Sequence, residues 1–74
     1  MGTKPSIHVV KSMYEHAWMK APGVEGVGIG KDIYGDETII IYTSDITSTS
    51  RYITLSIQGY IIRIEQSGEF NAYT

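Results

Sequence analysis

Gly23-Val24-Glu25-Gly26-Val27-Gly28-Ile29-Gly30 is the stretch that decides the fold, because its glycines alternate with apolar residues. Side chains of a β-strand point alternately to opposite faces of the sheet. The stretch therefore predicts a strand with one apolar face, carrying Val27 and Ile29, and one face that carries glycine alone. A face without side chains allows close approach by a ligand phosphate, a partner chain or another part of the same domain.

The glycine run does not match the nucleotide-binding motifs. A dinucleotide fingerprint needs G-x-G-x-x-G at the start of a helix, but position 33 is Ile and another strand pattern follows. A phosphate loop needs G-x-x-x-x-G-K-[ST]; Gly30-Lys31 fits its end, but position 25 is Glu and position 32 is Asp. Asp32 would repel a phosphate group. These glycines are therefore predicted to have a structural role.

An amphipathic helix is predicted before this strand, over residues 5–20. Pro22 disfavours helical angles at Ala21, and Gly23 suits the left-handed residue that often follows a helix. Thr3 or Ser6 can cap the start. Trp18 is predicted to be either a core residue or an interface anchor. The apolar positions recur at spacings of three and four residues, which is the helical period: Ile7, Val10, Tyr14, Ala17 and Ala21.

Two more strands are predicted after the glycine strand, over residues 37–44 and 59–65. Residues 31–36 contain Asp and Gly, which favour turns, and are predicted to form the turn of a hairpin between the first two strands. The polar residues 45–50 are predicted to form a surface loop. Residues 51–57 fit either a short helical turn or an irregular crossover, since their β-branched residues suit extended chain and their apolar spacing suits a helix.

These elements predict one α+β domain over residues 1–74, with an N-terminal helix on a three-stranded antiparallel sheet, as in a ferredoxin-like fragment with the order α-β-β-β. One helix covers one side of the sheet. The side facing the helix is predicted to carry Val24, Val27 and Ile29, two residues from the group Ile39, Ile40, Ile41 and Tyr42, and Tyr60, Ile62 and Ile64.

Composition excludes several classes of partner. The chain has 74 residues, a formal net charge of −2 and no cysteine, so neither a disulfide nor a thiolate metal site can stabilise it. Neither sign of charge is clustered, which argues against nucleic-acid binding. No apolar run approaches the ~20 residues of a membrane helix. We therefore expect a cytoplasmic protein that binds neither nucleic acid nor membrane.

No arrangement typical of catalysis is present, and we expect no enzyme activity, no catalytic residue and no cofactor. His8 and His16 lie two helical turns apart, about 12 Å along the axis, too far to share one metal. Asp32, Asp36 and Glu37 cluster at the hairpin turn without the spacing of a calcium loop. Arg63 and Glu65 are predicted to form a surface pair. No serine lies in a nucleophile elbow.

Two families share part of this pattern. Ala21-Pro22-Gly23-Val24-x-x-Val27-x-Ile29 and Gly59-Tyr60 resemble the middle of heavy-metal-associated ferredoxin-like domains, over about half the chain. The metal-binding C-x-x-C of that family is absent, so its metal function is not carried over. The segments 22–30, 57–64 and 68–70 are similar over the full length to small α+β domains that also occur upstream of trypsin-like peptidase domains. That resemblance implies an accessory or stand-alone module.

The uncovered side of the sheet is the best indication of function. An open sheet face with apolar residues usually marks an interface, and a small domain gains stability by oligomerising. We expect a non-catalytic assembly module that forms a homo-oligomer through this face or through a sheet edge. Its interface residues are predicted to be Gly26, Gly28, Gly30, Trp18, Ile61 and Arg63. The alternative is a small-ligand or metal-binding protein whose site lies between subunits, with His8, His16 or the turn at 32–37.

Overall fold

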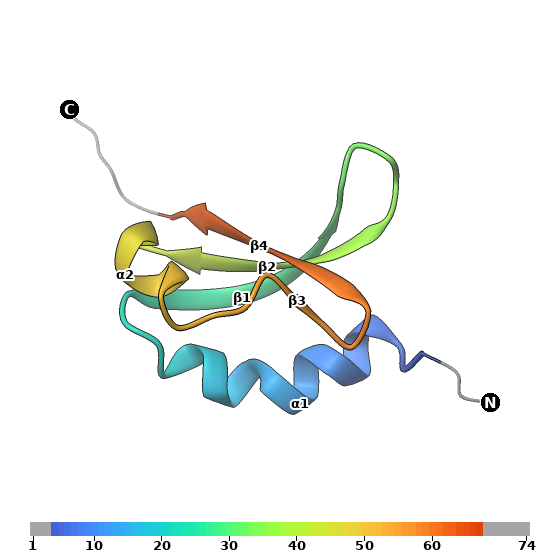
Figure 1. Cartoon of the computed structure of the whole chain (residues 1–74), viewed down its shortest axis with the longest axis horizontal. Helices are drawn as coiled ribbons and strands as arrows, with labels where there is room; N and C mark the ends of the chain where they lie inside the picture. Colours follow the sequence, from blue (N-terminus) through green and yellow to red (C-terminus); the bar gives the residue numbers. More distant parts are fainter. Residues whose placement is uncertain (1–3, 68–74) are drawn as a thin grey trace.

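The computed structural model describes residues 4–67 and shows α1 lying along one side of a twisted sheet (Figure 1). Ser6 starts α1 by accepting a hydrogen bond from the Val9 N–H at 3.2 Å, as expected of a cap. The helix ends before Pro22, as predicted. The elements are α1 (Ile7–Met19), β1 (Val24–Lys31), β2 (Glu37–Thr43), α2 (Ile46–Ser50), β3 (Ser56–Ile57) and β4 (Tyr60–Gln66).

The α+β class is confirmed, but the predicted sheet is wrong in strand number and in direction. The sheet has four strands in the order β1-β2-β4-β3, and β4 runs parallel to β2. Residues 44–59, which contain α2 and β3, return the chain to the end of the sheet where β2 begins. A crossover of this kind is what a parallel neighbour requires. The antiparallel pairs are β1 with β2 and β3 with β4.

The segment predicted as a surface loop, residues 45–50, is instead largely the short helix α2. Asp45 caps it: one carboxylate oxygen accepts from the Ser48 N–H at 3.2 Å and the other from the Ser48 hydroxyl at 2.7 Å. These bonds favour the charged form and lower the pKa of Asp45. In the ambiguous segment that follows, Ile53 is buried in the core and Ser56–Ile57 forms β3.

The core lies between α1 and the middle of the sheet. Ile39 and Ile41 of β2 are fully buried there, so these are the two residues of that strand that face the helix. Val24, Val27 and Ile29 of β1 pack against the same core, as predicted, and so do Tyr60, Ile62 and Ile64 of β4. Trp18 is a core residue, stacked on Tyr14 with ring centroids 5.7 Å apart.

A chain of buried hydrogen bonds joins three separate segments. Thr49 must donate its hydroxyl proton to the Pro22 carbonyl, at 2.6 Å, because a carbonyl is an acceptor alone. Thr43 must then donate to Thr49, also at 2.6 Å, and it accepts from the Asp45 N–H at 3.0 Å. Gly23 lies against this chain with φ +81°, and a Cβ there would be 2.8 Å from the Thr43 hydroxyl. The turn after α1, the end of β2 and α2 are thus held together.

The segment before α1 is attached to the start of β4. The Tyr60 hydroxyl donates to the Pro5 carbonyl at 2.6 Å, across 55 residues of sequence. Lys4 Nζ lies 4.2 Å from the centre of the Tyr60 ring, a cation–π contact.

Replacing Thr49 by Val leaves the Thr43 hydroxyl without its acceptor and the Pro22 carbonyl without its donor. We expect Thr49→Val to lower the free energy of unfolding by about 1–3 kcal/mol, measured by urea denaturation. Thr47→Val in the same helix is the matched control, because Thr47 is exposed; its effect should stay within about 0.5 kcal/mol. Equal losses in both variants would contradict a structural role for the buried chain.

Candidate functional site

The sheet face opposite α1 brings together five of the six predicted interface residues. Strand alternation and register place Gly26, Gly28 and Gly30 of β1 on this face beside Tyr42, Ile40 and Thr38 of β2. Ile61 and Arg63 lie on the same face of β4. The sixth residue, Trp18, lies in the core on the other side and is buried.

The bare side of the glycine strand is filled mainly by the chain itself. A Cβ on Gly28 would lie 3.2 Å from the Tyr42 ring, and one on Gly30 would lie 2.7 Å from the Ile40 Cδ1. Among the described residues, none has an atom within 4 Å of a Cβ on Gly26. Glycine at positions 28 and 30 therefore makes room for side chains of the neighbouring strand, which is one of the three kinds of neighbour considered for the bare face.

The rest of this face is partly polar. Arg63 donates from Nε to Glu65 at 2.8 Å, and Nη2 contacts the same carboxylate oxygen, which confirms the predicted surface pair. The exposed apolar residues of the face are Ile61, at 57% exposure, and Tyr42, at 36%. These two side chains do not form a broad apolar patch.

The outer edge of β1 is a second candidate surface. Within residues 4–67, β1 pairs with β2 on one side and with no strand on the other. No residue of β1 is buried, whereas five of the seven residues of β2 are. A β-bulge between Val24 and Gly26 ends the regular pairing at Glu25. The segment 26–31 is therefore an accessible, regular edge.

The hairpin ladder shows which backbone groups point outward from this edge. The Asp32 N–H donates to the Asp36 carbonyl at 2.9 Å, so this pair bonds across the hairpin. In an antiparallel ladder, hydrogen-bonded and non-hydrogen-bonded pairs alternate. Counting back two residues at a time from Asp32 shows that the backbone N–H and C=O groups of Gly30, Gly28 and Gly26 point toward β2. The backbone N–H and C=O groups of Val27, Ile29 and Lys31 then point away from the sheet.

The tip of the β1–β2 hairpin exposes two large apolar side chains. Ile33 is 89% exposed and Tyr34 is 82% exposed, and the hairpin extends beyond the rest of the sheet (Figure 1). The Asp32 carboxylate fixes the turn by accepting from the N–H groups of Tyr34, at 2.8 Å, and Asp36, at 2.9 Å. The turn therefore presents Ile33 and Tyr34 in a defined conformation.

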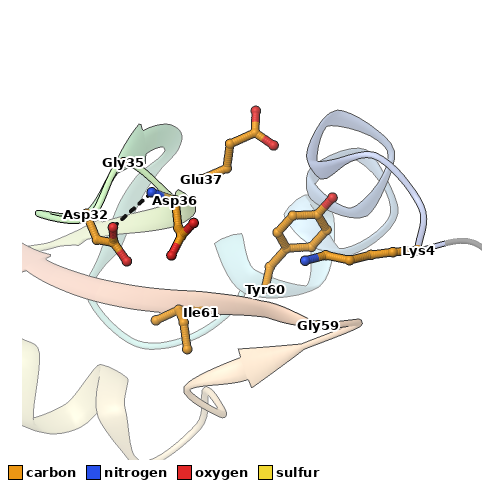
Figure 2. A pocket seen from close by; sticks show the side chains of 8 residues that line it. All are labelled: Lys4, Asp32, Gly35, Asp36, Glu37, Gly59, Tyr60 and Ile61. Carbon is orange, nitrogen blue, oxygen red and sulfur yellow. Dashed lines mark hydrogen bonds between the residues drawn. The ribbon is translucent and has the colours of Figure 1, made fainter.

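Two hollows flank these surfaces. A polar one of about 670 Å³ lies between the hairpin turn and the start of β4 (Figure 2). An apolar one of about 510 Å³ lies where α1 meets the α2–β3 connection. Sequence reasoning missed the second hollow, because Tyr52, which lines it, is far from Trp18 along the chain. The apolar hollow is lined by Ala17, Trp18, Lys20, Ala21, Pro22, Tyr52, Ile53 and Thr54.

The predicted metal-binding residues do not converge in the part of the chain that the structure describes. Within residues 4–67 no group of three or more His, Cys, Asp or Glu side chains could hold a metal ion. Figure 2 shows the carboxylates of Asp36 and Glu37 pointing in different directions. His8 and His16 are exposed on α1.

Comparisons with protein-family models, with curated proteins and with solved structures gave no match to this chain. In the described residues, no helix has the length and apolar character needed to cross a membrane.

The two kinds of glycine position predict opposite effects of an added methyl group. Gly26 and Gly30 both lie outside the left-handed region, so alanine fits either backbone. Gly26→Ala meets open space and should raise the free energy of unfolding by about 0.5 kcal/mol, by restricting the unfolded chain. Gly30→Ala must displace the Ile40 side chain and should lower the free energy of unfolding by about 1 kcal/mol. Chemical denaturation of both variants tests this; a Gly30→Ala variant as stable as Gly26→Ala would contradict the close packing of Ile40.

Proposed function

We propose that this chain is a non-catalytic interaction module that forms a homo-oligomer by pairing the outer edge of β1 with a second copy. The observation that carries the proposal is the accessible edge of β1, with the outward backbone groups of Val27, Ile29 and Lys31. Unpaired N–H and C=O groups along a strand are a template for another strand. A second copy supplies such a strand in the same conformation.

Features that block sheet edges are sparse along this strand. Natural proteins protect an edge with proline, bulges, inward-pointing charges or very short strands. The opposite sheet edge follows this rule, because β3 has two residues. Segment 26–31 contains neither proline nor a bulge, and its one charged residue, Lys31, stands at its end.

The edge is favoured over the open face, the other surface expected from the sequence. Two of the three glycines on that face are already covered by Tyr42 and Ile40. The Arg63–Glu65 pair would have to lose water for a second sheet to pack there, which costs free energy. Edge pairing leaves both features in solvent. The cytoplasmic location and the alternative of a ligand or metal site between subunits remain predictions.

Light scattering coupled to gel filtration tests the proposal, with the expectation of at least a dimer whose fraction rises with protein concentration. Lys31→Pro removes one outward N–H without removing a hairpin hydrogen bond, so it should weaken assembly and keep the fold. Lys31→Thr is the matched control, since it loses the same charge but keeps the N–H. Far-UV circular dichroism monitors folding.

Two outcomes would count against edge pairing. A wild-type chain that stays monomeric at every concentration contradicts self-assembly. A folded Lys31→Pro variant that assembles as well as Lys31→Thr contradicts pairing through this edge.

A further inference from the structure

We propose that two copies pair antiparallel along β1 about a two-fold axis at Gly28, and that each hairpin tip then lies against the turn after α1 of the other copy. The inference rests on the proposed self-assembly and specifies its register and its second contact. In this register Gly28 lies opposite Gly28 of the partner copy, and Val27 lies opposite Ile29 of the partner copy.

The sequence of β1 is self-complementary about Gly28. Gly26 and Gly30 are equidistant from it, and so are the two β-branched residues Val27 and Ile29. Antiparallel pairing in this register therefore puts the apolar side chains of Val27 and Ile29 opposite each other, twice in each dimer. Side-chain pairs directly across two strands stabilise the pairing of those strands.

Backbone geometry restricts the registers in which two β1 strands can pair. Outward groups of one copy must meet outward groups of the other, and these belong to the odd-numbered positions from Val27 to Lys31. The neighbouring symmetric registers are centred on Val27 or on Ile29. The first would place Glu25 opposite Ile29 of the partner copy, and the second would place Lys31 opposite Val27 of the partner copy. Of these three registers, the one centred on Gly28 places an apolar residue opposite both Val27 and Ile29.

The same register brings two exposed apolar features together. Ile33 and Tyr34 lie as far beyond Gly28 in one copy as Gly23 and Pro22 lie before it in the other, so this register brings the hairpin tip near the Pro22–Gly23 turn of the partner copy. Pro22 lines the apolar hollow of about 510 Å³. The hairpin tip is among the most exposed apolar parts of the described chain, so this contact removes apolar surface from water on both sides.

The two-fold arrangement closes the assembly. Each copy uses its β1 edge and its hairpin tip once and receives the equivalent groups of the other copy, which is an isologous interface. The outer edges of the combined sheet are then the two short β3 strands. Growth beyond two copies by the same contact is therefore prevented.

Single-cysteine cross-linking tests the register, since the natural chain contains no cysteine. Directly opposed residues have Cα atoms about 4.5–5.5 Å apart, within the disulfide limit of about 7 Å. Gly28→Cys should therefore form a covalent dimer under mild oxidation. In the matched control, Gly26→Cys, the two cysteines lie four residues apart along the strand, about 13 Å, and should stay unlinked.

Folding is controlled separately, because a Cβ at position 28 requires the Tyr42 ring to move slightly. Circular dichroism checks both cysteine variants. A variant without a cysteine tests the second contact, between the hairpin tip and the turn after α1. Tyr34→Ser should raise the dimer Kd about tenfold or more, a loss typical of an interface tyrosine. The control Leu55→Ser, at an exposed position outside β1 and the hairpin, should leave the Kd unchanged.

Each outcome is informative. Cross-linking of Gly26→Cys as efficient as that of Gly28→Cys overturns the register. A Tyr34→Ser dimer as tight as wild type overturns the hairpin-tip contact. If either occurs while light scattering still reports a wild-type dimer, self-assembly stands and this inference fails. A wild-type monomer overturns both.

Discussion

The buried hydrogen-bond chain from the Asp45 N–H through Thr43 and Thr49 to the Pro22 carbonyl is the constraint on which the rest of the structure depends. It attaches the end of α1 to the end of β2 and to α2. Because β2 carries Ile39 and Ile41, the two fully buried isoleucines of the central strand, the same chain of bonds sets where α1 lies over the core. A cysteine-free domain of this size has neither disulfides nor thiolate-bound metal to supply such a connection.

Local patterns were enough to predict the elements that depend on near neighbours. The alternation of glycine and apolar residues predicted a strand where β1 lies, and Pro22 predicted the end of α1, because proline restricts the residue directly before it. The start was predicted less closely, since both Thr3 and Ser6 suited a cap and the structure has Ser6 there. The face of β1 that contacts the helix followed from Val27 and Ile29.

Elements that depend on distant contacts could not be predicted in this way. The serine- and threonine-rich segment 46–50 has weak helical propensity, and its helix is held by the bond from Thr49 to Pro22, 27 residues away. The parallel position of β4 beside β2 likewise depends on the route of the crossover. At the candidate site, the glycine alternation revealed a strand without side chains on one face, but Tyr42 and Ile40 fill that face only because β2 is next to β1.

The bond from the Tyr60 hydroxyl to the Pro5 carbonyl has a consequence for how the chain folds. It closes a loop of 55 residues, and contacts between residues so far apart slow the search for the native state. β2 and β4 can pair in parallel only after β4 has been synthesised. During synthesis the helix and the β1–β2 hairpin leave the ribosome before β4, with the β2 edge that β4 later occupies still open. That edge is a second surface, besides the β1 edge, that can pair wrongly while the protein is being made.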